Sequence, residues 1–552
     1  MNPGFFNCEL KSYFVVPYLT PMIIRFLFLL VLFFPATLMF GQDLSFSTRL
    51  GKEFKASRKS SLSDIVAHDA TGIYVTKQRF RSSLAGTNSY TLEQYDNVFN
   101  LIQSSDLEIE EEGHECRVEY FLHLQNRLYV FYSYANNKEK KNSLFVSEIN
   151  KKTLRPDGKK KKIGEIDYSG NSRRNDGNFD IRVSRDSSKI LVEYALPFDT
   201  DEPEQFGFNV LDEELNSLWE KSVTLPYKDQ LYDVESIRVD NQGNVYLLGI
   251  VYKDKHKDKR KGKPNYSYEV IACRDKGNSL TQYPVSLEDK FITDMQIQIL
   301  DNNNLICAGF YSKEGTFSIR GTYFLTIDAE TKAIKTKSIK EFDLDFITQN
   351  MSEREANRAV RKEKKGEEAE LYEYNLDNLL VGKDGSAILI GEQYYVTTYT
   401  TTSRMNGVTT THTTTYYNYN DIIAVKVNAA GQIEWAEKVA KTQHTSDDGG
   451  FFSSYTLAIV NGKICFIFND SPKNLDKAAA NSGKTYNFRA NNLVVVVASL
   501  DRNGKETRQP IFSSVDLEVI ARPKVCEQIS NKEVILFGQR RKTQQFAKIT
   551  FE

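Results

Sequence analysis

The chain has 552 residues, of which 40% are hydrophobic, 12% aromatic and 26% charged. This content excludes disorder for most of the chain and allows a substantial core, in several domains or one large repeat architecture. Basic and acidic residues nearly cancel, for a formal net charge of −1, so no global positive field is present and we expect no nucleic-acid partner.

Residues 1–41 read as a signal peptide. An apolar run at residues 26–40, FLFLLVLFFPATLMF, follows Arg25 and ends just before Gly41. This run is typical of a signal-peptide core and is shorter than the roughly 20 apolar residues of a membrane helix. We expect cleavage after Gly41, with Met22 as an alternative start and an uncleaved anchor as the alternative interpretation. The expected product is exported to the periplasm, cell surface or medium and is not an integral membrane protein after cleavage.

The chain beyond the signal peptide has an odd number of widely spaced cysteines, which argues against a disulfide framework. They are Cys116, Cys273, Cys307, Cys465 and Cys526. Each lies in an apolar or alternating stretch, so we expect small buried core residues, with one incidental bridge as the alternative.

One unit recurs along the chain. It contains a half-apolar strand, a turn rich in Asp, Asn and Gly, an apolar second strand, a variable loop, a third strand, another polar turn and a more polar fourth strand. The predicted second strands begin at Gly72, Arg127, Lys189, Asn244, Asn304, Ser386, Lys463 and Glu533. The predicted third strands begin at Ser89, Ser143, Phe206, Tyr268, Thr322, Asp421, Asn492 and Gln545. Tight turns need a residue with positive φ at their tips. The residues expected to adopt this conformation are Gly243, Asn303, Gly385 and Gly462.

These units resemble the blades of a β-propeller. Continuous runs of Val, Ile, Leu and Phe predict strands buried on both faces, as in sheets that stack face to face. The resemblance covers residues 44–552 and carries no subfamily signature, because no WD dipeptide, kelch double glycine or regular Asp-box is present. We predict an all-β fold, a single β-propeller of eight four-stranded antiparallel blades over residues 42–552. Two smaller propellers or an open stack are the alternatives.

The last unit is one strand short. Residues 44–56, LSFSTRLGKEFKA, would supply its outer strand, so that the two chain ends share one blade and no sheet edge is left exposed.

Two insertions interrupt the predicted propeller. The first is helical, because Ser352 and Glu355 form a capping box that predicts a solvated helical insertion at about residues 350–370.

A basic stretch at residues 253–263, which is not one of these insertions, is interpreted as a solvated loop, as is the run at 159–162, with contact to an acidic polymer or membrane as the alternative.

The second insertion, about residues 394–420, is predicted to be a β-ribbon rich in Thr and Tyr. The Asn406-Gly407 pair is a hairpin signal, and folding about it places Tyr399 opposite Thr414 and Thr401 opposite His412. Arms of this length project roughly 30 Å. Such a ribbon suits a contact surface for a partner or glycan, and the alternative is a ribbon folded back over its own propeller. The candidate binding residues are Tyr395, Tyr399, His412, Tyr416 and Tyr417.

Propellers place ligand sites at a central channel lined by the innermost strand of each blade. The channel candidates are Asp64, His68, Arg117, Asp180, Arg182, Glu235, Arg238, Asp294 and Asp377, joined by Glu115, Tyr455, Lys524 and Glu527. Converging carboxylates suit Ca²⁺, but the interspersed Arg and Lys favour ion pairs that compensate one another, so we expect no cofactor.

No nucleophile elbow, zinc-protease motif or complete EF-hand occurs, and we assign no catalytic residues. Two hypotheses remain. The favoured one is an exported non-catalytic binding or scaffold protein for a protein, peptide or glycan; the alternative is a hydrolase or lyase with a metal or acid-base site in the channel.

Overall fold

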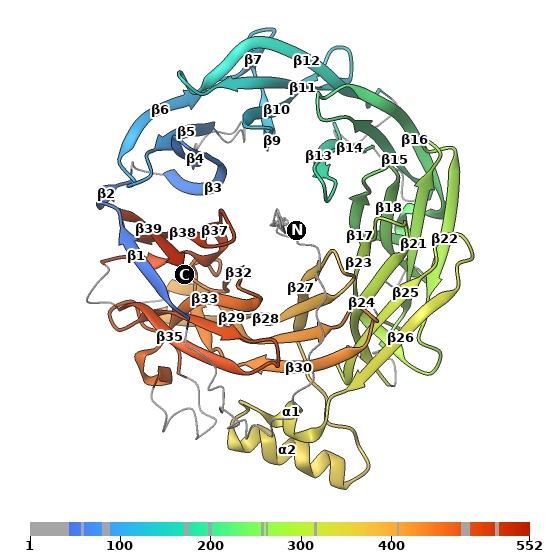
Figure 1. The fold of residues 1–552 in the computed structure, drawn as a ribbon, viewed down its shortest axis with the longest axis vertical. Helices are drawn as coiled ribbons and strands as arrows, with labels where there is room; N and C mark the ends of the chain where they lie inside the picture. Colours follow the sequence, from blue (N-terminus) through green and yellow to red (C-terminus); the bar gives the residue numbers. More distant parts are fainter. Residues whose placement is uncertain are drawn as a thin grey trace, which may run out of the picture.

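A computed structural model describes residues 44–56, 60–79, 89–169, 176–196, 201–254, 259–260, 263–313, 317–405, 408–475, 486–513 and 518–552. These residues form an all-β fold in which antiparallel sheets follow one another around a common axis (Figure 1). The expected signal peptide, the Asn406-Gly407 turn and most of the basic stretch at 253–263 lie outside the described residues.

The sheets are numbered here in chain order, and each is given from its innermost strand outward. Sheet 1 contains β3 (Ser60–Asp69), β4 (Gly72–Arg79), β5 (Ser89–Tyr95) and β6 (Leu101–Leu107). Sheet 2 contains β9 (Arg117–Leu124), β10 (Arg127–Asn136), β11 (Lys141–Asn150) and β12 (Arg155–Asp167). Sheet 3 contains β13 (Asn178–Val183), β14 (Ile190–Ala195), β15 (Pro203–Leu211) and β16 (Ser217–Lys228). Sheet 4 contains β17 (Tyr232–Val239), β18 (Val245–Tyr252), β21 (Tyr266–Arg274) and β22 (Ser279–Val285).

Sheet 5 contains β23 (Phe291–Ile299), β24 (Leu305–Ser312), β25 (Gly321–Ile327) and β26 (Ile334–Glu341). Sheet 6 contains β27 (Tyr374–Val381), β28 (Ala387–Met405), β29 (Val408–Val427), β30 (Ile433–Val439) and β31 (Gln443–Ser446), which pairs with β29. Sheet 7 contains β32 (Thr456–Val460), β33 (Lys463–Asp470), β34 (Val494–Leu500) and β35 (Glu506–Ser513). Sheet 8 contains β36 (Ile520–Ala521) and β37 (Glu527–Gln528), then β38 (Glu533–Arg540) and β39 (Thr543–Phe551), with β1 (Phe46–Leu50) and β2 (Phe54–Lys55) on β39.

The remaining elements are short. They are the hairpins β7 (Glu110–Glu111) with β8 (His114–Glu115) and β19 (Lys259–Arg260) with β20 (Lys263–Pro264), the helices α1 (Leu344–Thr348) and α2 (Glu353–Lys364), and the 3-10 turns η1 (Asp229–Leu231), η2 (Pro472–Leu475) and η3 (Pro523–Val525). Neither α-helix in the described part of the chain is long and apolar enough to cross a membrane.

The predicted second and third strands are all confirmed, and so is their turn chemistry. Gly243, Asn303, Gly385 and Gly462 all have positive φ, between 63° and 87°. In the turn at Gly243, the Asp240 Oδ1 atom accepts the backbone N–H groups of residues 242 and 244 at 2.9 and 2.8 Å. The carboxylate thus accepts hydrogen bonds from backbone N–H groups of the turn.

The sheets pack face to face because their central strands are apolar on both sides. In β18, Tyr246 and Leu248 belong to a buried cluster shared with sheet 5, whereas Leu247 belongs to a cluster shared with sheet 3. Side chains of a strand alternate between its faces, so one continuous apolar strand serves two interfaces. Similar clusters join each described sheet to the next along the chain.

Glycines lie where the backbones of neighbouring strands approach closely. A Cβ atom added to Gly309 of β24 would lie 2.0 Å from the Asp294 carbonyl oxygen of β23, too close for any side chain. The glycines that recur in the second strands therefore allow the innermost strand to sit tightly against its neighbour.

The first and last described segments meet in sheet 8. β1 pairs with β39 from Phe46 opposite Phe551 to Leu50 opposite Ala547. The Phe546 ring lies 4.9 Å from Tyr95 and 5.6 Å from Phe99 between ring centroids, so sheet 8 also packs on sheet 1. One buried cluster accordingly contains residues of sheets 7, 8 and 1.

One predicted strand differs. The channel candidates Lys524 and Glu527 imply a single innermost strand in sheet 8, but β36 and β37 share this position, separated by η3. Pro523 starts this 3-10 turn, because proline has no N–H for a strand ladder and a fixed φ. Lys524 therefore lies in a turn rather than on a strand.

The helical insertion is bound to sheets 5 and 6. The capping box at Ser352 and Glu355 is present. The Arg320 guanidinium donates to Glu363 of α2 at 2.9 Å and to the Ala369 carbonyl at 2.6 Å. On the other side, the Lys438 ammonium donates to the Phe346 carbonyl of α1 at 2.8 Å.

The five cysteines named above are all free and buried, as the sequence predicted. They are distributed over four of the apolar clusters between sheets.

Candidate functional site

The innermost strands carry all nine principal channel candidates. Asp64 and His68 are on β3, Arg117 is on β9, Asp180 and Arg182 are on β13, Glu235 and Arg238 are on β17, Asp294 is on β23 and Asp377 is on β27. These strands lie nearest the axis in Figure 1. Of the additional candidates, Glu527 is on β37, Glu115 is on the separate hairpin strand β8, Lys524 is in η3, and Tyr455 immediately precedes β32.

β-Bulges place acidic residues on the innermost strands, which together are here called the wall. The register slips by one residue in β3, β9, β17, β23 and β27. The extra residue is Glu119, Glu235 or Asp377 in β9, β17 and β27, and Thr293, followed by Asp294, in β23. β3 slips twice, at Ser63, which precedes Asp64, and at Val66. A bulge re-aims a side chain that strict alternation would direct elsewhere, and such bulges are common beside functional sites.

Asp294 links two neighbouring innermost strands. Its Oδ2 atom accepts the Leu376 N–H of β27 at 3.0 Å, and its Oδ1 atom accepts the Met295 N–H at 2.8 Å. Burial nevertheless raises the pKa of Asp294 to about 7, and the Glu235 carboxylate adds to the rise. A carboxyl in this state can hold or release a proton near neutral pH.

Asp377 is the next carboxyl around the wall. The hydroxyl of Tyr455, just before β32 of sheet 7, donates to the Asp377 Oδ2 atom at 2.7 Å. Burial raises the pKa of Asp377 to about 8, and the negative charge of Glu392 adds to the rise. Asp294 of sheet 5 and Asp377 of sheet 6 thus lie on neighbouring innermost strands, and the pKa values of both carboxyls are raised.

Behind Asp377 lies a buried ion pair that the sequence analysis missed. The Lys441 ammonium lies 2.7 Å from Glu392 Oε1, and both side chains are almost wholly buried. Lys441 also donates to the Tyr419 carbonyl at 2.9 Å and to the Gln443 side chain at 3.1 Å, while Ser454 donates to Glu392 Oε2 at 2.7 Å. Such a network is favourable only when its hydrogen bonds are made, so it fixes the geometry where β28, β29 and β31 meet.

The rest of the wall contains opposite charges close together. Arg182 lies 2.6 Å from Asp180, and Arg117 lies 2.7 Å from Glu119. Burial raises the pKa of Asp64 to about 6, although Ser63 and the Arg522 guanidinium act in the opposite direction. Among the described residues, no group of three or more His, Cys, Asp or Glu is placed to hold a metal ion.

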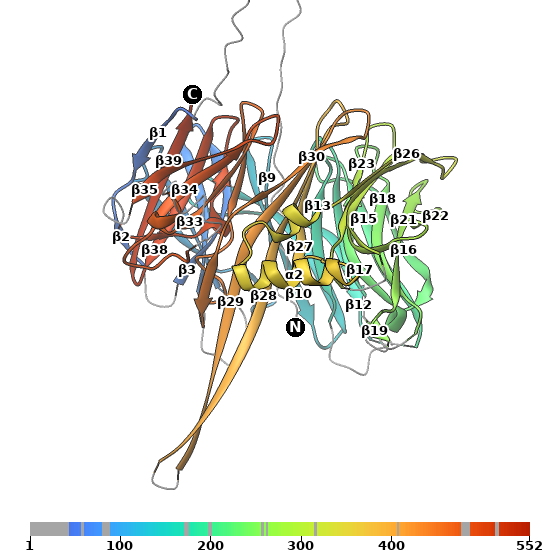
Figure 2. The same ribbon diagram turned by 90° about the horizontal axis from the view of Figure 1, so that it is seen from below.

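The Thr/Tyr ribbon is the other candidate site. Figure 2 shows β28 and β29 leaving sheet 6 together and projecting well beyond the ring, rather than folding back over it. Tyr399 lies opposite Thr414 and Thr401 lies opposite His412, in the expected register. At the foot, β31 adds a third strand along residues 416–419 of β29.

The candidate binding residues lie on two faces of this ribbon. Residues directly opposite in an antiparallel pair share a face, and successive residues alternate. Tyr395, Tyr399, His412 and Tyr416 therefore lie on one face, here called the aromatic face, and Tyr417 lies on the other.

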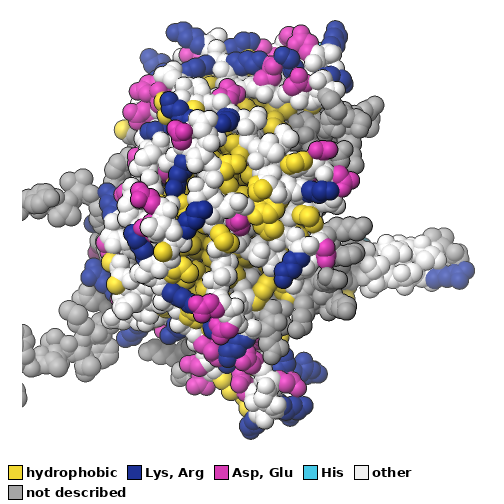
Figure 3. Space-filling model, turned by 90° about the vertical axis from the view of Figure 1, so that its right-hand side faces the viewer, with side chains coloured by type: hydrophobic (Ala, Val, Ile, Leu, Met, Phe, Trp, Pro, Cys, Tyr) yellow, Lys and Arg dark blue, Asp and Glu magenta, His cyan; other side chains and the backbone are white. Residues whose placement is uncertain are grey.

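The aromatic face is ordered by ring contacts. The Tyr416 ring stacks on His444 of β31 with centroids 4.9 Å apart, and Tyr399 meets Tyr416 edge-on at 5.5 Å. Tyr399 is 62% exposed. The opposite face is rich in threonine, and Thr400 and Thr413 hydroxyls hydrogen-bond across it at 3.1 Å. Figure 3 shows the ribbon as almost uncharged, apart from a basic side chain at its far end.

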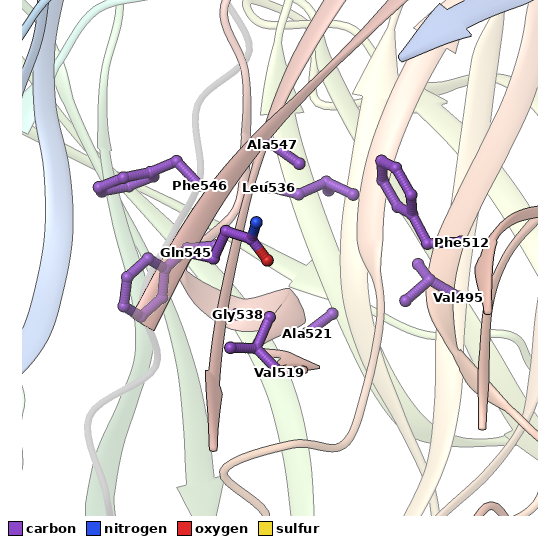
Figure 4. Close-up of a pocket in the computed structure, with 10 residues that line it drawn as sticks. Val495, Phe512, Val519, Ala521, Leu536, Gly538, Gln545, Phe546 and Ala547 are labelled. Atoms are coloured by element: carbon purple, nitrogen blue, oxygen red, sulfur yellow. The ribbon is translucent and has the colours of Figure 1, made fainter. Parts of the chain in front are cut away.

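An internal cavity between sheets 7 and 8 belongs to the core (Figure 4). Its lining is apolar apart from Gln545, whose amide donates to the Gly51 carbonyl at 2.9 Å. It has room for about one water molecule, far too little for a ligand.

No family model and no curated protein matches the chain. Among solved structures, it is similar to an acylaminoacyl peptidase from Pyrococcus horikoshii, at 10% identity over 88% of this chain and 60% of the peptidase, with a TM-score of 0.32. It is similar to an apocarotenoid oxygenase from Synechocystis, at 8% identity over 91% of this chain and 93% of that chain, with a TM-score of 0.30. A third is an α-L-arabinanase from Penicillium chrysogenum, at 9% identity over 52% of this chain and 98% of that chain, with a TM-score of 0.28. At these TM-scores the similarities carry no argument about activity or ligand.

The raised pKa of Asp377 makes stability depend on pH. Because this pKa is higher in the folded chain than in an unfolded one, the contribution is fully present below about pH 4 and is lost as pH rises through about 8. In the Asp377→Asn variant, the fall in the free energy of unfolding between pH 5 and 8 should be shallower by up to about 1.4 kcal/mol per pH unit. Urea unfolding at several pH values measures it.

Asp384→Asn is the matched control, since hydrogen bonds from Ser386 lower the pKa of this exposed aspartate and it does not titrate above pH 5. An unchanged slope in Asp377→Asn would contradict the assignment of a retained proton to this carboxyl.

Proposed function

We propose that this chain is an exported, non-catalytic binding or scaffold protein that contacts a protein, peptide or glycan through its ribbon. The observation that carries the proposal is the aromatic face, where Tyr399 stands exposed in front of the stacked Tyr416 and His444 rings. The proposed contact requires no cofactor, and the near-neutral chain offers nothing to attract nucleic acid.

Tyrosines on an ordered support are good contact residues. Each offers a large amphipathic ring with only two side-chain torsions to fix, so binding orders little that was free. The stacked rings of Tyr416 and His444 hold the support in place before any partner arrives. Between Gln393 and Arg404 no residue is charged, so short-range packing and hydrogen bonds, rather than long-range attraction, would select the partner.

We also propose that sheets 1–8 are the blades of one eight-bladed propeller, closed by β1 in the last blade. The pairing of β1 with β39 and the buried cluster common to sheets 7, 8 and 1 support this architecture. A closed ring gives the ribbon a rigid base, and the buried Lys441–Glu392 pair fixes the ribbon's foot to that base.

Export is proposed from the sequence of residues 1–41. The proposed destinations are the periplasm, the cell surface or the medium, and the mature chain would be free of the membrane. A protein that acts outside the cytoplasm would meet envelope glycans and proteins, which fits an uncharged aromatic contact surface.

The alternative is a hydrolase or lyase with an acid-base site on the channel wall. The observation that favours it is the pair of half-buried carboxyls, Asp294 and Asp377, whose raised pKa values suit proton transfer near neutral pH. The binding proposal takes precedence because two other acids of the wall are paired with arginine, Glu119 with Arg117 and Asp180 with Arg182.

The ribbon proposal predicts that two tyrosines carry much of the affinity. A variant with Tyr399→Ser and Tyr416→Ser should bind its partner at least about tenfold more weakly, since buried aromatic contacts are each worth about 1–2 kcal/mol. Quantitative capture of envelope proteins and of arrayed glycans by the immobilised protein measures this.

The control for this variant is Thr398→Ser with Thr415→Ser, a pair on the opposite face of the same ribbon. Equal capture by both variants and the wild type would refute the ribbon as the contact surface. Loss of function in Asp377→Asn with normal capture by the tyrosine variant would favour the enzyme.

The export proposal predicts the mature N-terminus. When the whole gene is expressed in a bacterial host, the protein recovered outside the cytoplasm should begin at Gln42, as read by N-terminal sequencing. A membrane-bound product that retains residues 26–40 would indicate the uncleaved anchor.

A further inference from the structure

The ribbon has an open strand edge along β28. β27 pairs with β28 only up to Gln393, and the Tyr394 N–H then donates to the Glu373 carbonyl at 2.8 Å. Among the described residues, no strand pairs with this edge of β28 beyond that point. In an antiparallel ladder alternate residues point their N–H and C=O groups outward, so the open groups after Tyr394 belong to Val396, Thr398, Thr400 and Thr402.

The other edge of the ribbon is partly occupied. β31 pairs with β29 up to Tyr416, and the Asp447 side chain then accepts the Thr415 N–H at 2.8 Å. Asp447 also donates its own N–H to the Thr415 carbonyl at 2.8 Å. A strand and a cap thus cover the start of this edge, whereas the part of the chain that the structure describes leaves the β28 edge open.

The open edge lacks the features that natural proteins use to prevent pairing. Residues 394–403 contain no Pro, no Gly and no charged residue, and nearly all are Thr, Tyr or Val, which favour strands. A projecting two-stranded ribbon is also only marginally stable in water without a third strand. Both facts indicate that the edge is built to receive a strand.

We propose that the occupant is a second copy of this chain, whose β28 edge pairs antiparallel with the first. The open stretch begins at Val396, and its last outward residue before Arg404 is Thr402, so its midpoint is Tyr399. Two copies related by a two-fold axis at that midpoint place Val396 of each opposite Thr402 of the other and bring the two Tyr399 side chains face to face.

Charge supports this register. Glu373 fills the position opposite Tyr394, where the ladder must stop, and it is exposed. In the two-fold arrangement the ladder ends at Thr402, and Arg404 of each copy leaves it beside Glu373 of the other, so that a guanidinium meets a carboxylate at both ends. A pair of this kind at an exposed site sets register more than it adds affinity.

The second copy is favoured over a foreign peptide for two reasons. Its strand is already formed, so pairing does not carry the entropy loss of ordering a flexible segment. The ribbon also extends far from the ring (Figure 2), so antiparallel pairing places the two rings at opposite ends of the joined ribbons, where they do not collide. The resulting four-stranded ribbon would carry the aromatic faces of both copies on one surface.

The register is tested by single cysteines. In an antiparallel sheet directly opposite residues have Cα atoms about 4.5–5.5 Å apart, within disulfide reach. Tyr399→Cys should therefore form a covalent dimer under mild oxidation, read on a non-reducing gel. Thr401→Cys is the control: it is exposed on the same face, but its two copies would be about 13 Å apart. The native cysteines in the described chain are buried and should not compete.

The edge is tested without cysteines by sedimentation. Thr400→Pro removes an outward N–H of β28 and should shift the protein at tens of micromolar from dimer to monomer. Thr411→Pro makes the same change on the β29 edge and should leave the dimer intact. Thermal unfolding of each variant should match the wild type, which shows that the ring remains folded.

A wild-type protein that is monomeric at all concentrations, with Tyr399→Cys cross-linking no faster than Thr401→Cys, would overturn the proposal. Equal loss of the dimer in both proline variants would also overturn it. Because the test reads self-association alone, its failure leaves the capture of a partner by the aromatic face unaffected, and the two proposals fail separately.

Discussion

The constraint on which the structure depends is that its sheets are apolar on both faces. β18 sends alternate side chains into two different clusters, and β24 does the same with Cys307 on one side and Phe310 on the other. A sheet of this kind must be covered on both sides, so each sheet needs two neighbours. A linear series would leave its two end faces bare, whereas here Phe546 of sheet 8 is buried against the rings of Tyr95 and Phe99.

The two candidate sites follow from this arrangement. Packing on both faces leaves only the innermost edges and the loops free to vary. At the inner edge, bulges occur at Glu235 and Asp377, and burial raises the pKa of the Asp377 carboxyl to about 8. Among the connections between strands, the one between the second and third strands of sheet 6 is extended, and it forms the ribbon. The Lys441–Glu392 pair fixes the ribbon to the rigid part of the fold, so its aromatic face has a fixed position.

Much of this architecture could be predicted from the sequence, because strand alternation, turn chemistry and capping are local. The positive φ of Gly243 and the register of Tyr399 with Thr414 needed only neighbouring residues. The bulges, the Lys441–Glu392 pair and the break at Pro523 depend on contacts between strands distant in sequence. Tyr417 was grouped with Tyr416, although adjacent residues of a strand face opposite ways. A recurring acid five residues before the turn, as at Glu235 and Asp377, was the available signal for the bulges.

The most direct measurement of the central claim is the thermal unfolding of a chain that begins at residue 57 beside one that begins at residue 42. If β1 and β2 complete sheet 8 and join the chain ends, the shorter chain exposes the β39 edge and loses the contact of Phe54 with Phe546. It should then unfold at a markedly lower temperature, in a broader transition. Identical transitions for the two chains would contradict a ring held closed by its own N-terminus.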